Sequence, residues 1–124
     1  MKKILIHSSR LQGVVTLSGA KNSALRLLAA SILTDERVTL TNYPAGLLDT
    51  QVHVGMLDAL GKSCVVGPDT ASIDETDPLS ERLAWDGRSI RNTLLILGAL
   101  TARRCESRRQ NGQRKRSGDL TVAE

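Results

Sequence analysis

The residues best suited to chemistry form one short string, Ser18-Gly19-Ala20-Lys21-Asn22, where a β-branched stretch gives way to helix-forming residues. Glycine lets the chain turn sharply and lets an anion approach the backbone closely. The first N–H groups of a helix have no partner inside the helix and carry the positive end of its dipole. Lys21 adds a mobile positive charge, and Asn22 can donate an amide hydrogen bond or cap the helix. The string therefore predicts a site for a phosphate or a carboxylate.

Geometry alone also leaves a plainer interpretation open, in which Gly19 makes a turn, Lys21 is solvated and Asn22 caps the helix. The string has the spacing of neither a P-loop nor a dinucleotide-binding fingerprint. Taken alone, Arg91 is an exposed arginine in a first helical turn. Asp49 alone is a carboxylate near a helix N-terminus, where it stabilises the helix by about 0.3–1 kcal/mol.

The elements expected to position these residues alternate along the chain. We predict strands at residues 4–7, 13–17, 38–41, 63–66 and 71–74, and helices at residues 22–33, at residues 48–60 ending at Gly61, and from residues 88–91 onward. From residue 13 the order is strand, helix, strand, helix, strand, strand, helix. This order predicts an α/β or α+β class with a mixed sheet.

Composition favours one modest globular domain. The chain has 124 residues, of which 40% are hydrophobic, and it has no Phe, one Trp and one Tyr. The core must therefore be aliphatic, and no aromatic platform is available for stacking bases. No apolar run is long enough for a membrane span, and the N-terminus does not resemble a signal peptide. We therefore expect a cytoplasmic location without membrane contact.

Few side chains suggest metal or redox chemistry. Cys64 and Cys105 are the only two cysteines and have no metal-ligand spacing, so neither a metal nor a cofactor is expected. His7 and His53 have no partner at catalytic spacing and are interpreted as structural.

The basic charge belongs to the end of the chain. Residues 1–102 hold ten Lys/Arg and ten Asp/Glu, whereas residues 103–124 hold seven Lys/Arg and three acidic residues. No aliphatic side chain lies between Cys105 and Asp119, so residues 104–124 are predicted to be disordered. Such a tail can bind nucleic acid through phosphates alone. The same composition is typical of a frameshifted GC-rich gene, and we favour that interpretation over nucleic-acid binding.

Longer stretches resemble the enolpyruvyl transferases that act on UDP-N-acetylglucosamine. The resemblance covers residues 3–103 in unbroken order. It is carried by the string within residues 13–33, by Leu40-Thr41-Asn42-Tyr43-Pro44 with Leu47-Leu48-Asp49, by Met56-Leu57-Asp58-Ala59-Leu60-Gly61, and by Ile90-Arg91-Asn92-Thr93 leading into residues 97–103. It implies βαβαββ units of an inside-out α/β barrel, here incomplete, in which residues 1–20 pair with a second domain and residues 21–103 form part of the first.

The resemblance also implies a reaction. The enolpyruvyl group of phosphoenolpyruvate is transferred to the 3-hydroxyl of UDP-N-acetylglucosamine, phosphate leaves, and the product is committed to peptidoglycan synthesis. By resemblance, Lys21 and Asn22 contact phosphoenolpyruvate and Arg91 contacts the UDP-sugar. Asp49 matches an aspartate near the active cleft and is the one catalytic candidate.

The sequence also departs from the family. The family's mobile Pro-Gly-Gly-Cys loop, with its general-acid cysteine, is absent. Cys105 comes only 14 residues after Arg91, so it is not expected to replace that cysteine. Without the far end of the family chain, residues 4–17 should expose apolar side chains and an unpaired edge that favours association. We expect no turnover from these 124 residues alone. A non-catalytic partner of a full-length transferase is the alternative.

Overall fold

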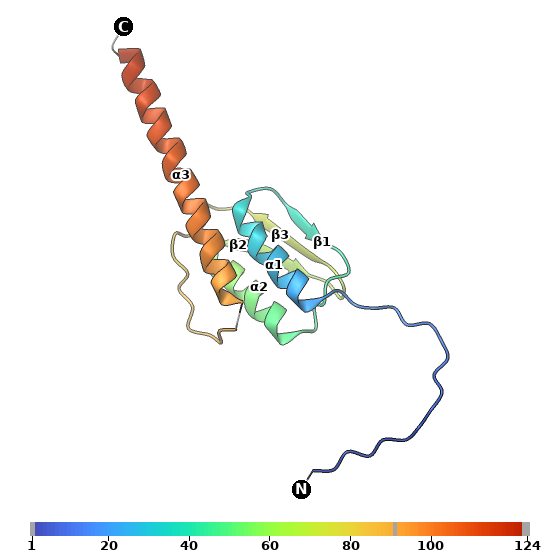
Figure 1. The fold of residues 1–124 in the computed structure, drawn as a ribbon. Helices are drawn as coiled ribbons and strands as arrows, with labels where there is room; N and C mark the ends of the chain where they lie inside the picture. The colour runs from blue at the N-terminus through green and yellow to red at the C-terminus, as the bar shows by residue number, and fades with distance from the viewer. Residues whose placement is uncertain (1, 91, 123–124) are drawn as a thin grey trace.

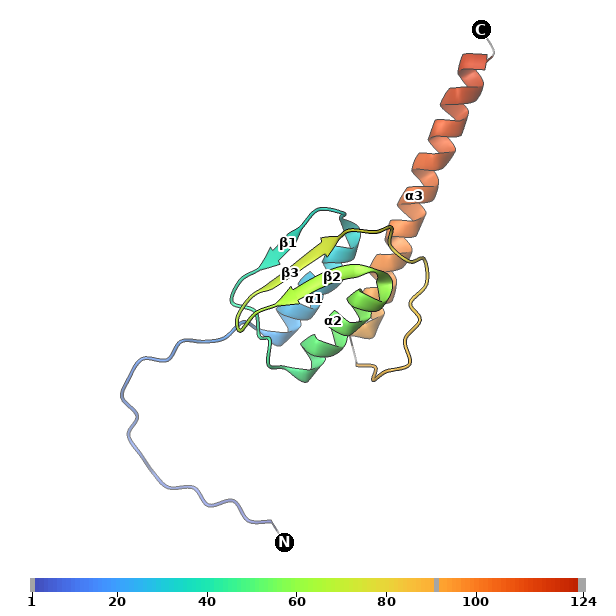
Figure 2. The same ribbon diagram turned by 180° about the vertical axis from the view of Figure 1, so that it is seen from behind.

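The computed structural model describes residues 2–90 and 92–122, with side chains described as far as residue 112. Figure 1 shows α1 and α2 lying against a small sheet, with α3 running alongside α1 and out beyond the body. Seen from behind in Figure 2, the sheet lies in front of α1 and α2. The elements are α1 (Lys21–Ala30), the short 3₁₀ helix η1 (Ser31–Leu33), β1 (Val38–Leu40), α2 (Leu48–Leu60), β2 (Lys62–Val66), β3 (Ala71–Glu75) and α3 (Thr93–Val122).

The three described strands form one sheet in the order β1-β3-β2. Both neighbours of β3 pair with it antiparallel, and Ile73 is opposite Val38 on one side and Cys64 on the other. The predicted mixed sheet is therefore wrong for the residues that the structure describes. β1 and β2 do run the same way, as a strand-helix-strand unit requires, but β3 returns between them and separates the parallel pair.

The core is aliphatic, as the composition predicted. It is formed by one face of α1, one face of α2, the centre of β3 and the first turns of α3, and it includes Leu28, Met56, Leu57, Leu60 and Ile96, all completely buried. Each fully buried side chain of this size stabilises the fold by about 1.5–3 kcal/mol. The predicted bounds of α2 are confirmed. Gly61 ends α2 with a φ of 106°, a left-handed conformation that favours glycine.

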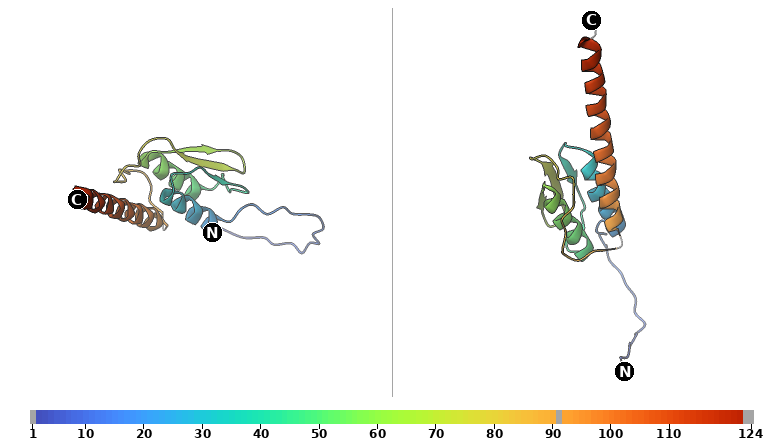
Figure 3. Two further views of the ribbon diagram at one scale, coloured as in Figure 1. Left: turned by 90° about the horizontal axis from the view of Figure 1, so that it is seen from above. Right: turned by 90° about the vertical axis from the view of Figure 1, so that its left-hand side faces the viewer.

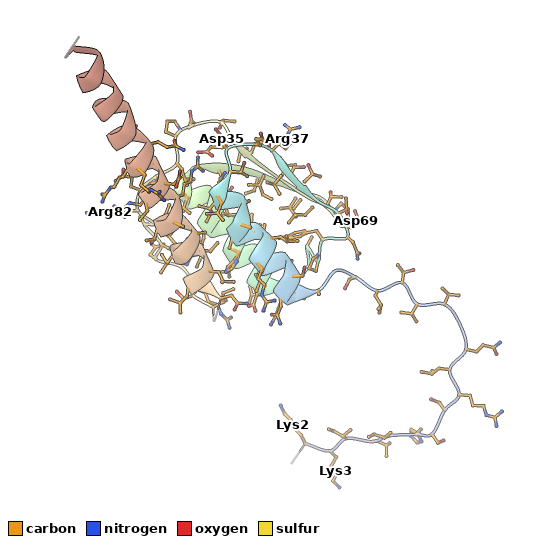
Figure 4. The ribbon with its side chains drawn as sticks, turned by 45° about the horizontal axis from the view of Figure 1, so that its top comes forward. Lys2, Lys3, Asp35, Arg37, Asp69 and Arg82 are labelled. Carbon is orange, nitrogen blue, oxygen red and sulfur yellow. The ribbon has the colours of Figure 1, made fainter. Side chains whose placement is uncertain are left out.

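The N-terminal segment, residues 2–20, departs from the predicted strands. Up to Ser18 it extends away from the body, it has no strand pairing, and Figure 4 shows Lys2 and Lys3 at its far end. A strand needs a ladder partner for its N–H and C=O groups, and residues 4–7 and 13–17 find none in the described chain. The expected exposure of apolar side chains is confirmed, because Ile4 is 88% and Val14 is 98% exposed.

One expectation for α3 is wrong. The helix begins at Thr93 instead of residues 88–91, and the Thr93 Oγ1 accepts a hydrogen bond from the Ile90 N–H at 3.1 Å. The helix also continues to Val122, and the disorder expected for residues 104–124 stays a prediction. Arg, Lys, Gln and Glu are good helix formers, and a helix held by packing at one end gains one hydrogen bond for each residue added. Within the described residues, no helix combines the length and apolarity that crossing a membrane requires.

A buried ion cluster ties α3 to the sheet. The Arg103 guanidinium donates to both carboxylate oxygens of Glu75 at 2.8 and 2.9 Å and to the Ile32 carbonyl at 2.9 Å. Lys62 reaches the same carboxylate at 3.2 Å and the Thr34 carbonyl at 2.7 Å. Burial raises the pKa of Glu75, but hydrogen bonds and charge from Arg103 and Lys62 outweigh it and hold that pKa below its ordinary value. The carboxylate therefore stays charged between two cations.

The long connection from β3 to α3 is held by Trp85. Its ring lies against Gly55 of α2 and against Gly87, where an added Cβ would come within 2.9 and 2.7 Å of ring atoms. Its indole N–H donates to the Arg88 carbonyl at 3.0 Å. The views in Figure 3 show this connection passing around the end of α2 before α3 begins. The start of α3 is thus brought to the same end of the molecule as the starts of α1 and α2.

Candidate functional site

Gly19 brings the start of α1 against the end of β1. A Cβ at this position would collide with the carbonyl oxygen of Asn42, so only glycine permits the contact. Asn42 itself has a φ of 51°, in the left-handed region that asparagine tolerates better than most residues. The backbone of the Asn42-Tyr43-Pro44 turn is thereby fixed beside the first residues of α1. The glycine of the sequence string is required by this packing.

The first turn of α1 offers open peptide N–H groups. Ala20 occupies the N-cap position and provides no side-chain cap. The first N–H to bond within the helix is that of Ala24, which donates to the Ala20 carbonyl at 3.0 Å. Asn22 is therefore the second residue of the helix, and the interpretation that it caps the helix is wrong. The first turn contains no acidic residue, so the positive end of the helix dipole is available to an anion.

Lys21 and Asp49 form an ion pair across two helix N-termini. Lys21 Nζ lies 3.3 Å from Asp49 Oδ2, and the two side chains are 50% and 29% exposed. Asp49 lies in the first turn of α2, where the helix dipole stabilises a negative charge. The Thr50 hydroxyl lies within hydrogen-bond distance of the Pro44 and Leu47 carbonyls, at 3.0 and 2.8 Å, and holds the start of α2 to the preceding turn. The structure thus brings together two of the residues that the sequence singled out.

These residues line a hollow of about 440 Å³, which we call the Lys21 hollow. Its walls come from α1, from the start of α2 and from the segment that precedes α3. The lining residues are Lys21, Asn22, Arg26, Asp49, Ile90 and Asn92. Arg91 lies outside the described residues, although its neighbours on both sides line the hollow. Two lysine or arginine charges face one carboxylate here, which favours a bound anion.

Arg26 and Asn92 were not selected from the sequence. Arg26 follows Asn22 by four residues, and residues at that spacing share one face of a helix. Its position was therefore predictable once the helix was assigned. Asn92 could not be found in this way, because the start of α3 reaches the hollow only through the long connection held by Trp85.

Neither thiol belongs to this site. Cys105 is exposed on α3, twelve residues beyond Thr93, which places it about 18 Å further along the helix axis. Burial is the main cause that raises the pKa of the Cys64 thiol on β2 to about 12. Cys64 is therefore protonated at neutral pH and unreactive. Among the described residues, the chemistry of the Lys21 hollow rests on amine, guanidinium, amide and carboxylate groups.

Comparison with known proteins gives a consistent result. Residues 6–119 match the family model for EPSP synthase (3-phosphoshikimate 1-carboxyvinyltransferase). A UDP-N-acetylglucosamine 1-carboxyvinyltransferase from Desulforapulum autotrophicum is 43% identical over 105 residues, which cover 83% of this chain and 25% of that protein. The proteins of the same name from Acinetobacter baylyi and Acidiphilium cryptum are 41% and 38% identical, over 83% and 87% of this chain.

The chain spans about a quarter of the length of these relatives. The family model nevertheless covers most of the chain, and the resemblance noted from the sequence string is confirmed at the level of the family. The described helices and antiparallel sheet are compatible with an α/β class, whereas the barrel stays a prediction. This chain belongs to the EPSP synthase family of enolpyruvyl transferases.

Proposed function

We propose that the Lys21 hollow is the donor-binding part of an enolpyruvyl transferase site. We also propose that a full-length transferase containing this sequence transfers the enolpyruvyl group of phosphoenolpyruvate to the 3-hydroxyl of UDP-N-acetylglucosamine. The observation that carries the proposal is the Lys21–Asp49 pair, 3.3 Å apart beside the open first turn of α1. The names of the relatives supply the sugar nucleotide and the carboxyvinyl group. The product would serve peptidoglycan synthesis, and the proposed location of the reaction is the cytoplasm.

The donor carries a phosphate and a carboxylate, and each residue of the hollow has a role suited to them. Lys21 and the first N–H groups of α1 hold one anionic group, and the Asn22 amide donates to it. Arg26 supplies a second positive charge. Asp49 holds the Lys21 amine in the hollow and prevents it from swinging into solvent. Arg91 is proposed to contact the UDP-sugar, since Ile90 and Asn92 on either side of it line the same hollow.

The reaction replaces one carbon–oxygen bond with another. The 3-hydroxyl oxygen of the sugar forms a bond to the central carbon of the enolpyruvyl group, the bond from that carbon to the phosphate oxygen breaks, and the hydroxyl proton ends on the departing inorganic phosphate. Negative charge accumulates on the departing phosphate. Fixed positive charge and peptide N–H groups stabilise that charge without having to reorganise during the reaction. This is the contribution proposed for Lys21 and the start of α1.

We propose that the 124 residues alone bind the donor but do not turn it over. The Lys21 hollow is open on the surface of the described chain, and no described thiol lies beside it. Exclusion of water from such a site normally needs a second wall that closes over the substrate. The exposed apolar N-terminal segment, residues 2–20, is the surface through which we propose association with the remainder of a transferase, or with a full-length one.

Donor binding tests the proposal directly. Titration calorimetry with phosphoenolpyruvate should detect binding to the 124-residue chain, and Lys21→Ala should weaken it by about tenfold or more, since a charge-assisted hydrogen bond contributes about 1.5–3 kcal/mol. Lys3→Ala is the matched control, because it removes an equal charge from the far end of the N-terminal segment (Figure 4). Equal weakening by the two variants would contradict the site. Phosphate release by the 124 residues in a coupled assay with both substrates would contradict the predicted inactivity.

A further inference from the structure

His53 is the most unusual buried side chain near the Lys21 hollow. It lies on α2 and is completely buried. Within the described residues, neither Nδ1 nor Nε2 has a hydrogen-bond partner. Leaving a buried polar group unpaired costs about 1–3 kcal/mol, so an apolar residue would be more stable at a purely structural position. The interpretation of His53 as structural therefore leaves its chemistry unexplained.

The surroundings of His53 connect the three walls of the hollow. Asp49 precedes it by one helical turn on α2 and lies on the same face. The backbone carbonyls of Leu25, in α1, and of Asn92, before α3, are close enough to favour a protonated ring, although neither reaches hydrogen-bond geometry. A neutral imidazole has one N–H group and can donate to only one carbonyl, whereas a protonated ring has two N–H groups and can donate to both.

The charge balance around His53 is poised to respond to a ligand. Burial lowers the pKa of His53 below its ordinary value, and the Leu25 carbonyl, the Asp49 carboxylate and the Asn92 carbonyl oppose that effect. The ring is therefore neutral at neutral pH while the hollow is empty. The other charged groups that line the described part of the hollow are Lys21 and Arg26 on α1. Arg91 lies outside the described residues. An anion bound in the hollow would offset both cations and favour a proton on the ring.

We propose that His53 is a positioning residue that takes up a proton when an anion occupies the Lys21 hollow. The protonated ring then donates to the carbonyls of Leu25 and Asn92 and fixes α1 to the segment that precedes α3. The proton comes from solvent and no covalent bond changes. The identity of the anion, phosphoenolpyruvate, rests on the proposed function, whereas the response of His53 to negative charge in the hollow does not.

The two histidines of the chain allow a test with an internal control. The ring resonances of His53 and His7 can be followed by NMR from pH 5 to pH 8, with and without phosphoenolpyruvate. His7 lies in the exposed N-terminal segment and does not line the hollow, so its resonances serve as the control and should not respond to the donor. In the free protein His53 should titrate below the ordinary range of a histidine, and its titration should shift to higher pH when the donor binds. A His53 titration that is unchanged by bound donor would overturn the proposal.

Linkage gives a second readout. If binding brings a proton to His53, the affinity for the donor should rise more between pH 7.5 and pH 6 in the parent chain than in His53→Asn. The excess should be about fivefold. The asparagine keeps an amide donor but does not titrate. The comparison cancels the titration of the donor's own phosphate. An identical pH dependence in the two proteins would contradict the proposal.

The Lys21→Glu variant separates this proposal from the proposed function. It places a carboxylate in the hollow without any ligand and should by itself shift the His53 titration to higher pH. If phosphoenolpyruvate fails to bind the 124-residue chain but this shift occurs, the donor assignment is wrong and the role of His53 stands. If the donor binds, but neither donor binding nor the Lys21→Glu substitution shifts the His53 titration, His53 is a passive core residue.

Discussion

Two groups of charged residues in this molecule have the same chemistry and opposite surroundings. The cluster of Lys62, Glu75 and Arg103 is shielded, with side-chain exposures of 1%, 8% and 26%, and each member is bonded to protein atoms. The Lys21–Asp49 pair has one contact of 3.3 Å, and its lysine is half exposed. The buried cluster holds the fold together, whereas the Lys21–Asp49 pair keeps hydrogen-bonding capacity that a ligand can use.

The difference follows from the hydration that each charged group loses in the folded chain. Removing a charge from water costs several kcal/mol, so a buried charge must find partners in the folded chain. The carboxylate of Glu75 receives donors from two elements, and the cations also reach backbone carbonyls. An exposed pair keeps most of its hydration, so it needs no protein partners, and its interaction contributes only about 0–1 kcal/mol to stability. Exposure at the start of α1 is what the proposed binding site requires, whereas burial between β3 and α3 indicates a structural role.

The largest loss of unfolding free energy is expected from Glu75→Gln. Loss of the carboxylate leaves Lys62 buried without its counter-charge, and removing one partner of a buried pair destabilises a protein by about 3–5 kcal/mol. Asp74→Asn is the matched control, because Asp74 is the adjacent residue of β3 and pairs with the exposed Arg37. Urea unfolding followed by circular dichroism should show a large loss of unfolding free energy for the first variant only. Equal losses would show that burial does not distinguish the two pairs.

The second-largest effect expected is a loss of unfolding free energy as the pH falls. The pKa of Glu75 is lowered in the folded chain, so its stabilisation is present above about pH 4.5 and is lost as the pH falls below that value. The pKa of His53 is also lowered, and the unfolded chain therefore takes up its proton first as the pH falls below about 6.5. The unfolding free energy should fall in two steps, of which His53→Asn removes the upper and Glu75→Gln the lower. A single step in the parent chain would contradict this assignment.

Local sequence patterns predicted the parts of the fold that depend on neighbouring residues. Helix α2 was predicted with its end at Gly61, because apolar spacing and a glycine after the last turn are local signals. The site proposed at Lys21 rests on local signals of the same kind, and its binding role stays a prediction. The pairing of Lys21 with Asp49 was not predicted, although both residues were singled out. It depends on Gly19 approaching the Asn42 carbonyl, a contact between segments far apart in the sequence.

Errors arose where long-range packing decides the structure. The sheet was predicted as mixed, because local patterns do not reveal that β3 returns between β1 and β2. The role of Glu75 was missed because its partners Lys62 and Arg103 come from other elements. The end of the chain was predicted to be disordered from its lack of apolar residues, and this stays a prediction, since a helix anchored through Arg103 can extend without burying more surface.

The smallest effect on stability, and the sharpest on function, is expected from Asp49→Asn. The Lys21–Asp49 pair is partly exposed, so the unfolding free energy should change by less than about 1 kcal/mol. Removing the carboxylate also removes its repulsion of an anion, so inorganic phosphate should bind a few-fold more tightly. In a full-length relative, the same change should lower the rate of phosphate release, because the Lys21 amine is no longer held in place. Weaker phosphate binding by the variant would show that the hold of Asp49 on the Lys21 amine outweighs its repulsion of the anion.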